Sequence, residues 1–170
     1  MSETMWAGRF LEVRKQGSWE YAARRGGVSA AVIVAVEDGH LLLVEQMRIP
    51  IGRRCLELPA GLVGDDVAGE AVEIAAAREL EEECGYRPAR IEVLGEFQSS
   101  PGMTSEDFTL VRASGLTRVS KGGGVEGEGI EVHRVALDEL AAFVAAKRAA
   151  GVAIDSKLLA VLGPVLLGGL

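Results

Sequence analysis

The chain has 170 residues, of which 48% are apolar and 25% charged, and its net charge is −7. This length suits one domain with a sizeable core, and the composition excludes a disordered chain. Lys and Arg together number 18 against 25 acidic residues, so the chain lacks the basic field that a long nucleic-acid surface needs.

Membrane and secretory segments are not expected. The start, MSETMWAGRF, has no basic residues followed by an apolar run, as a secretory signal would. The longest apolar stretch, 158–170, is too short to span a bilayer. The two cysteines, Cys55 and Cys84, make no disulfide framework, so we expect them to be buried and the protein to be cytoplasmic.

Apolar runs bounded by turn residues predict strands along most of the chain. The clearest is a hairpin of Val28–Val36 and His40–Met47 with its turn at Glu37-Asp38-Gly39. The other predicted strands, in chain order, are Phe10–Val13, Trp19–Ala23, Cys55–Leu58, Ile91–Phe97, Phe108–Ala113 and Ile130–Val135.

Three helices are predicted between and after these strands. The first spans Glu70–Cys84, rich in Ala, Glu and Leu, with Gly85 as its C-terminal cap. The second follows Asp138 as N-cap and ends near Ala149, and the third covers roughly Ser156–Leu167. Strands, a helix, more strands and two helices indicate an α+β fold, a mixed sheet with helices on its faces. Between the last strand pair, residues 119–129 form a glycine-rich acidic loop that we expect to be mobile.

Three carboxylates crowd one face of the first predicted helix. Glu79, Glu82 and Glu83 lie at spacings of three and four residues, which places them together at ~100° per residue. Like charges at such spacing cost roughly 0.2–0.5 kcal/mol per pair, and acidic groups near a helix C-terminus oppose its dipole. A solvated acidic face is the plain alternative. A hard divalent cation with oxygen ligands would reverse the repulsion, and Mg²⁺ fits an all-Glu cluster better than zinc does.

These glutamates belong to a longer pattern, G-x5-E-x7-R-E-U-x-E-E-x-G-U, where U is apolar. The matching residues are Gly64, Glu70, Arg78, Glu79, Leu80, Glu82, Glu83, Gly85 and, more loosely, Tyr86. The chain therefore resembles the Nudix hydrolases. The resemblance implies the Nudix fold, a mixed β-sheet core sandwiched by helices, and hydrolysis of a nucleoside diphosphate linked to another moiety.

The resemblance also implies the metal site. Glu79, Glu82 and Glu83 are the expected ligands, for Mg²⁺ with Mn²⁺ as a substitute, and Glu70 and Arg78 form an expected structural ion pair. In the related ADP-ribose pyrophosphatases the glycine of the pattern directly follows a Pro-Ala or Val-Ala pair. Here Pro59-Ala60-Gly61 stands three residues before Gly64, so either glycine can hold that structural place. If Gly61 does, the Ala60 carbonyl is the expected backbone metal ligand.

Further segments are similar to the ADP-ribose pyrophosphatase branch and imply where the substrate binds. Trp19, Glu20 and Arg24 stand in a W-E-x-x-x-R segment whose Trp stacks on adenine and whose Arg meets phosphate, and Arg48 stands in a Q-x-R-x-P segment. Pro101 and Gly102 begin a loop like the family's S-P-G-x-[TS]-x-E. An indole face suits base stacking and an Arg fork suits phosphate oxygens. For Trp19, a core position is an equally weighted alternative.

Two loop glutamates are candidates for the general base. Glu106 ends the Pro-Gly loop and is slightly favoured, and Glu128 lies in the glycine-rich loop. Glu82 is a further candidate for orienting the attacking water.

The expected reaction is Mg²⁺-dependent hydrolysis of ADP-ribose or a related ADP-sugar to AMP and a sugar phosphate. The alternatives are a GDP-mannose or other nucleotide-sugar pyrophosphatase and, from another class, a non-catalytic ADP-ribose-binding sensor. By resemblance, residues 26–170 form the Nudix domain. Residues 1–25 form an N-terminal β segment that contacts adenine and phosphate and is exchanged between the subunits of a homodimer.

Overall fold

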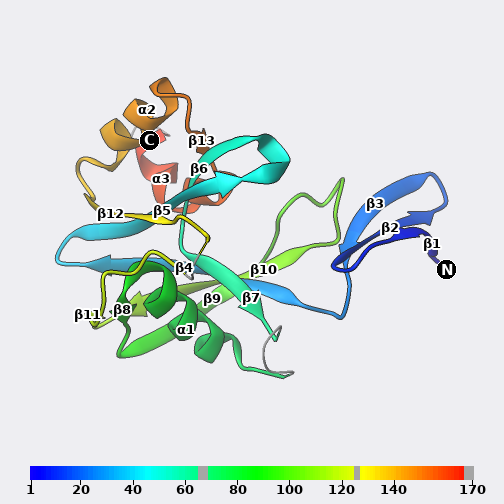
Figure 1. The fold of residues 1–170 in the computed structure, drawn as a ribbon, viewed down its shortest axis with the longest axis horizontal. Coiled ribbons are helices and arrows are strands. Elements are labelled where there is room, and N and C mark those ends of the chain that lie inside the picture. Colours follow the sequence, from blue (N-terminus) through cyan, green and yellow to red (C-terminus); the bar gives the residue numbers. More distant parts are fainter. Residues whose placement is uncertain (65–68, 125–126, 167–170) are drawn as a thin grey trace.

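The computed structural model describes residues 1–64, 69–124 and 127–166, and it places a central sheet between helices with a small N-terminal sheet to one side (Figure 1). The predicted α+β class and mixed sheet are confirmed. The strands are β1 (Glu3–Ala7), β2 (Leu11–Gln16), β3 (Trp19–Arg24), β4 (Ser29–Glu37), β5 (His40–Arg48), β6 (Arg53–Glu57), β7 (Ala60–Val63), β8 (Tyr86–Arg87), β9 (Arg90–Gln98), β10 (Asp107–Ser114), β11 (Thr117–Arg118), β12 (Glu131–Ala136) and β13 (Ala153–Ile154).

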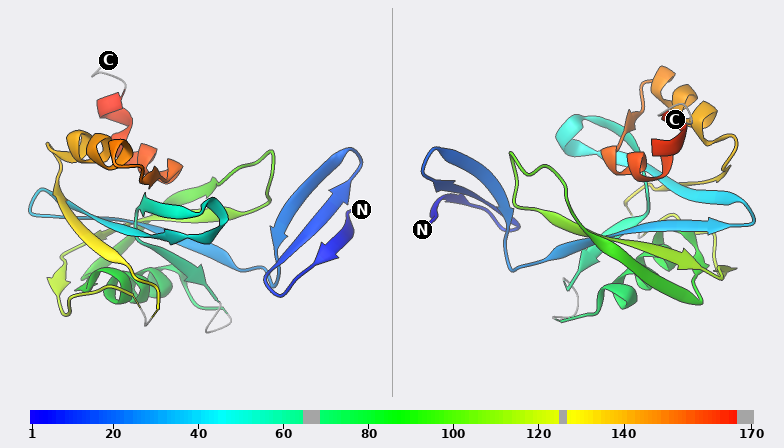
Figure 2. Two further views of the ribbon diagram at one scale, coloured as in Figure 1. Left: turned by 45° about the horizontal axis from the view of Figure 1, so that its top comes forward. Right: turned by 180° about the vertical axis from the view of Figure 1, so that it is seen from behind.

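The N-terminal sheet is an antiparallel meander, β1-β2-β3, that stands apart from the main body in every view (Figure 2). Its strands β2 and β3 confirm two predictions, whereas β1 was not predicted. The sheet is held to the main body beside the Pro-Gly loop. There Ala22 donates its N–H to the Met103 carbonyl and accepts from the Ser105 N–H, at 3.0 Å each. These backbone bonds bring Trp19 and Arg24, on the same strand, next to that loop.

The central sheet opens along the predicted hairpin of β4 and β5. Asp38 and Gly39 both have positive φ, as a two-residue type I′ turn requires. The two strands pair only next to this turn, at Val36–Leu41 and Glu37–His40. Beyond it, β4 pairs with β7 and, in parallel, with β10, while β5 pairs with β6 and β12. The far ends of β4 and β5 therefore diverge, and a cleft opens between them.

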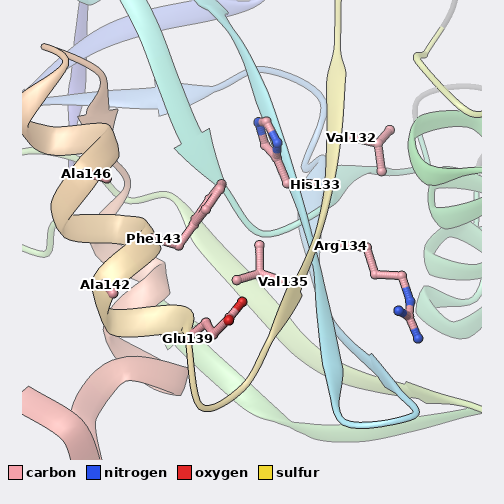
Figure 3. Close-up of a pocket in the computed structure, with 8 residues that line it drawn as sticks. All are labelled: Val132, His133, Arg134, Val135, Glu139, Ala142, Phe143 and Ala146. Carbon is pink, nitrogen blue, oxygen red and sulfur yellow. The ribbon is translucent and has the colours of Figure 1, made fainter.

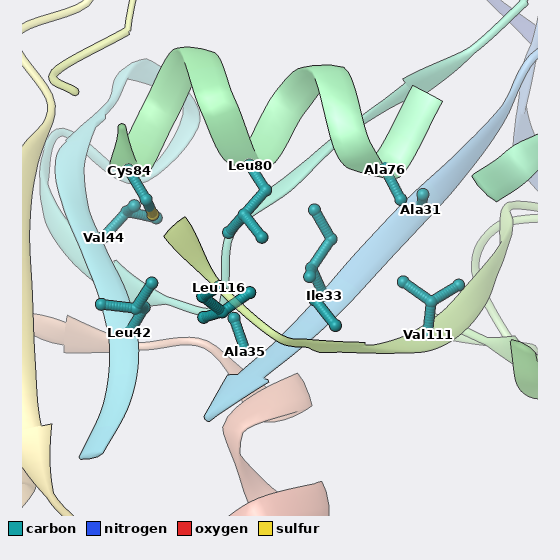
Figure 4. Packing of buried hydrophobic residues seen from close by; sticks show 11 residues of the cluster. Ala31, Ile33, Ala35, Leu42, Val44, Ala76, Leu80, Cys84, Val111 and Leu116 are labelled. Atoms are coloured by element: carbon teal, nitrogen blue, oxygen red, sulfur yellow. The ribbon is translucent and has the colours of Figure 1, made fainter. Parts of the chain in front are cut away.

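Helix α1 (Val72–Cys84) covers one face of this sheet. Ala76, Leu80 and Cys84, spaced four residues apart, pack onto Ile33 and Val44 (Figure 4). Leu80 is fully buried, which stabilises the fold by roughly 2 kcal/mol. Because the apolar stripe faces the sheet, the glutamates beside it are carried to the edge of the cleft.

The ends of α1 agree only in part with expectation. Gly85 caps the C-terminus with a left-handed φ of 77°, as predicted. The helix was expected to start at about Glu70 and begins two residues later, at Val72, where Ala71 as N-cap makes no side-chain hydrogen bond. The ion pair of Glu70 and Arg78, at 3.5 Å, confirms the predicted brace.

The C-terminal helices cover the other face. Helix α2 (Leu140–Ala149) has Glu139 as its N-cap, so the prediction of Asp138 was wrong by one residue. The predicted third helix is divided into a 3-10 turn, η2 (Ser156–Leu158), and α3 (Leu159–Leu166), and its expected end at Leu167 lies outside the described residues. A further 3-10 turn, η1 (Ile49–Ile51), follows β5. No helix in the described ranges has the length and apolar character needed to cross a membrane.

Candidate active site

A cleft of about 650 Å³ lies between the diverging ends of β4 and β5, beside α1. Most of the predicted site residues meet there. Its charged lining comprises Arg24, Arg48, Lys157, Glu57, Glu79, Glu83, Glu106, Glu128 and Asp155. Six carboxylates thus face three cations in the described part of the cleft, so an anionic ligand would be repelled unless further cations join it.

Glu83 is one of the two buried carboxylates of this cleft, together with Glu57. Its exposed fraction is 6%, and it accepts a hydrogen bond of 3.0 Å from the Ala60 N–H. Burial raises the pKa of Glu83 to about 8; the Ala60 N–H opposes this rise, while the Glu79 and Glu128 carboxylates add to it. A buried carboxyl group with acidic neighbours suits a hard cation, which would stabilise its charged form.

Glu79 lies against Gly61, and the contact leaves no room for a side chain at that position. A Cβ on Gly61 would be 1.9 Å from the Glu79 Cδ atom. Gly64, by contrast, has a φ of 83°, a conformation that favours glycine for a backbone reason. Glycine is therefore favoured at Gly64 by the backbone conformation and at Gly61 by the close contact with the Glu79 side chain.

Glu82 is placed differently from the other two glutamates. Its side chain is 43% exposed and 3.7 Å from Arg78, and it is not part of the described cleft lining. Arg78 also contacts Glu79 at 2.8 Å. The helix therefore brings Glu79 and Glu83 into the cleft and leaves Glu82 outside its described lining.

Arg48 is held in the cleft by a two-pronged ion pair. Its Nε and Nη2 atoms donate to the two oxygens of Glu57 at 2.6 and 2.7 Å. Glu57 is 3% exposed, and the hydrogen bond that its carboxylate accepts from Arg48 raises the pKa of Arg48. The arginine that was predicted to contact the ligand is therefore oriented in advance by a buried partner, Glu57, to which the sequence alone assigns no role.

Two other predicted residues contact each other. The Arg24 Nε atom donates to Glu106 at 2.6 Å, and Ser99 donates its hydroxyl to the same carboxylate at 3.3 Å. The expected phosphate ligand and the expected base are thus paired. A phosphate that took the Arg24 guanidinium would release the Glu106 carboxylate for proton transfer.

Three of the four remaining predicted substrate residues lie in a second hollow. Trp19, Pro101 and Gly102 line it, and its volume is about 560 Å³. Trp19 is 61% exposed, so the alternative of a core aromatic was wrong. Glu20 lines neither hollow, and its carboxylate lies 3.7 Å from the Lys15 ammonium.

Glu128 reaches the cleft from the glycine-rich loop. The described part of that loop is attached to the end of α1, where Gly123 and Gly124 donate backbone N–H groups to the Glu83 and Glu82 carbonyls at 2.8 and 3.0 Å. A Cβ on Gly122 would lie 2.5 Å from the Cys84 backbone. The expected loop mobility is thus limited at this end, which is hydrogen-bonded to the helix that carries Glu79, Glu82 and Glu83.

A separate charged cluster lies on the opposite face of the sheet, near a hollow between β12 and α2 that is lined by His133 and Phe143 (Figure 3). In the described chain, Glu45, Glu131 and His133 are the group whose potential ligand atoms come within 4.8 Å of one another. Glu45 is already bound there, by Arg54 at 2.5 Å and Lys147 at 2.6 Å. Two cationic side chains thus take the place that a metal ion would need.

The comparisons with known proteins agree with this geometry. The NUDIX domain family model matches residues 26–160, so the chain belongs to the Nudix family. It is 36% identical to an ADP-ribose pyrophosphatase of Mycobacterium tuberculosis, over 71% of this chain and 60% of that protein. It is 35% identical to a methanol dehydrogenase activator of Bacillus methanolicus, over 71% of this chain and 64% of that protein.

A solved structure described as an ADP compounds hydrolase is similar with a TM-score of 0.67 and 25% identity, over 84% of this chain and 80% of that one. The chain spans less than two thirds of the length of the two curated relatives. The family match begins at residue 26, so the N-terminal sheet of β1, β2 and β3 lies before the matched region.

Proposed function

We propose that this protein is a Mg²⁺-dependent pyrophosphatase that hydrolyses ADP-ribose or a related ADP-sugar to AMP and a sugar phosphate. One observation carries the proposal. The buried Glu83 and its neighbour Glu79 lie in the same cleft as two arginines that are suited to a diphosphate. The Mycobacterium tuberculosis relative, described as an ADP-ribose pyrophosphatase, supports the choice of substrate.

The donor set fits the metal that this reaction requires. Glu79, Glu83 and the Ala60 backbone would hold Mg²⁺ or Mn²⁺, and Glu82 would join from the margin. When bound, the metal supplies charge neutralisation of the diphosphate and a more acidic water. The excess of carboxylates over cations in the described cleft supports this requirement, because the substrate is itself an anion.

The chain's own groups supply binding and proton transfer. Trp19, with Pro101 and Gly102, offers a hollow for the adenine. Glu20, next to Trp19 on the same strand, stays a candidate for substrate contact although it does not line that hollow. Arg24 and Arg48 offer forks for the phosphates. Glu106 is favoured as base over Glu128, because Arg24 holds it beside the position expected for phosphate.

A nucleotide-sugar panel with and without Mg²⁺ tests the proposal. We expect AMP from ADP-ribose only with the metal, and faster turnover of ADP-ribose than of GDP-mannose. Glu83→Gln should remain folded and lose nearly all turnover, while Arg148→Met, on the exposed surface of α2, should keep it. Binding of ADP-ribose without AMP release would instead identify a sensor, and preferred turnover of GDP-mannose would identify the other sugar class.

We also propose that the protein is a homodimer. The N-terminal sheet exposes Trp6, Phe10 and Trp19, each at 59% or more, which supports a covered surface in an assembly. In the structure this sheet already contacts the Pro-Gly loop of its own chain, so a dimer need not exchange it. Light scattering coupled to size-exclusion chromatography gives the mass directly, and a monomer at micromolar concentration would contradict the proposal.

A further inference from the structure

The cleft has residues that neither the metal nor the diphosphate requires. These are Gln46, Cys55, Phe108, Asp155 and Lys157. The glutamates of the cleft suit cations and its arginines suit phosphates. The remaining side chains form a part of the lining that is suited to neither. It combines an amide, an aromatic face and a paired ammonium and carboxylate.

Asp155 and Lys157 form a compact pair at the start of η2. The Lys157 Nζ atom is 2.6 Å from the Asp155 Oδ2 atom, and the Asp155 Oδ1 atom accepts the Lys157 backbone N–H at 2.7 Å. The Lys157 side chain is 24% exposed and the Asp155 side chain 18%. The Lys157 ammonium also lies 6.0 Å from the centre of the Phe108 ring. The pair is therefore partly open to the cleft and next to an aromatic surface.

The position of this pair is fixed by the fold. Strand β13 pairs in parallel with β6, with Ala153 opposite Cys55, and Asp155 donates its backbone N–H to the Leu56 carbonyl at 3.0 Å. Leu158, at the end of η2, is fully buried and anchors the turn in the core. Side chains held by such a framework are positioned before a ligand arrives.

The charge of the pair indicates its ligand. A further phosphate would be attracted by Lys157 but repelled by Asp155, so the pair as a whole does not favour an anion. Neutral hydroxyl groups can use both members, because the ammonium donates hydrogen bonds and the carboxylate accepts them. A ring of sugar carbons can also lie against the Phe108 face. This combination suits a neutral polyhydroxyl group.

We propose that Asp155 and Lys157 bind the hydroxyl groups of the sugar on the far side of the diphosphate, and so determine which sugar is accepted. The inference rests on the proposed function, since it assigns the part of the substrate that leaves with the second phosphate. It gives the C-terminal turn η2 a role in specificity.

The test compares two substrates of equal charge, ADP-ribose and the β-methyl ester of ADP, which keeps the diphosphate and lacks the sugar. Lys157→Met keeps the aliphatic stem beside Phe108 and removes the ammonium. Asp155→Asn keeps an acceptor for the turn and removes the charge. Each variant should lower kcat/KM for ADP-ribose roughly 10-fold or more and change that for the methyl ester less than about twofold, because charged hydrogen bonds to the sugar are lost.

The controls separate the two proposals. Arg148→Met should leave both substrates unchanged, and thermal unfolding checks that each variant is folded; if Lys157→Met is not, Asp155→Asn carries the test. If the methyl ester is not turned over, its inhibition constant against ADP-ribose replaces kcat/KM. Equal losses on both substrates, or no loss on ADP-ribose, would overturn the assignment of the sugar while the hydrolase stands. A wild-type protein that hydrolyses no ADP-sugar would overturn the proposed function itself.

Discussion

Replacement of Gly61 by alanine tests whether the cleft is built around the position of Glu79. The new Cβ would lie 1.9 Å from the Glu79 Cδ atom and 2.3 Å from its Oε1 atom. Carbon atoms pack at about 3.5–4.0 Å, so the carboxylate must move by roughly 1.5 Å. The contact is with the end of a flexible side chain, and φ of Gly61 is outside the left-handed region, so the backbone can accept alanine.

The expected result is a loss of function in a stable protein. Displacing a metal ligand should weaken metal affinity by about 10- to 100-fold, or roughly 1.4–2.7 kcal/mol. Stability should change by less than about 1 kcal/mol, since alanine restricts the unfolded chain more than glycine does.

The assay is a Mg²⁺ titration of AMP release from ADP-ribose, together with thermal unfolding. Gly163→Ala, in α3, is the matched control, because its Cβ meets nothing within 4 Å. In a Glu79→Gln background, Gly61→Ala should cost little more, because both changes act on the same carboxylate. A Gly61→Ala protein with wild-type turnover and the same Mg²⁺ half-saturation would refute the reasoning.

Three more predictions concern other parts of the molecule. Glu106→Gln should lower kcat more than KM in steady-state assays; unchanged kcat there, with Glu128→Gln inactive, would transfer the role of base to Glu128. Trp19→Ala should raise KM for ADP-ribose by roughly 5- to 100-fold through lost stacking, with stability little changed, and an unaltered KM would place the adenine elsewhere. Burial alone would raise the pKa of Glu45, but hydrogen bonds from Lys147 and Arg54 outweigh it and lower that pKa to about 2. A depressed pKa contributes stability that is present above about pH 4.5 and lost as the pH falls toward 2, at most about 3 kcal/mol here. Urea unfolding between pH 5 and pH 2 should therefore show a smaller loss for Glu45→Gln than for the wild type, and equal losses would count against this ion pair.

Local sequence patterns were enough to predict the elements whose turn or cap residues lie within a few positions of one another. The hairpin at Asp38-Gly39 follows from two residues that accept positive φ between apolar runs. The end of α1 at Gly85 follows from the same tolerance. The start of α1 is two residues later than expected, because Ala71 offers no capping side chain that would mark it in the sequence.

Two short strands that depend on a remote partner were not predicted. Strand β7 exists because Ala60–Val63 pairs with Ser29–Val32 of β4. Strand β13 is only two residues long and pairs with β6, about a hundred residues earlier in the chain. No periodicity can appear in segments this short.

The family resemblance, the helix with its glutamates and the residue types suited to a diphosphate follow from the sequence, because each is a pattern of residues at fixed spacings within a short segment. The fold is needed to show that Glu79 and Glu83 enter the cleft while Glu82 stays outside its described lining. It also decided that Arg24 meets Glu106, and that Lys157 joins the same cleft from the C-terminal turn. The reason is that these contacts depend on how strands diverge and pair across the whole chain, which no local pattern of residues specifies.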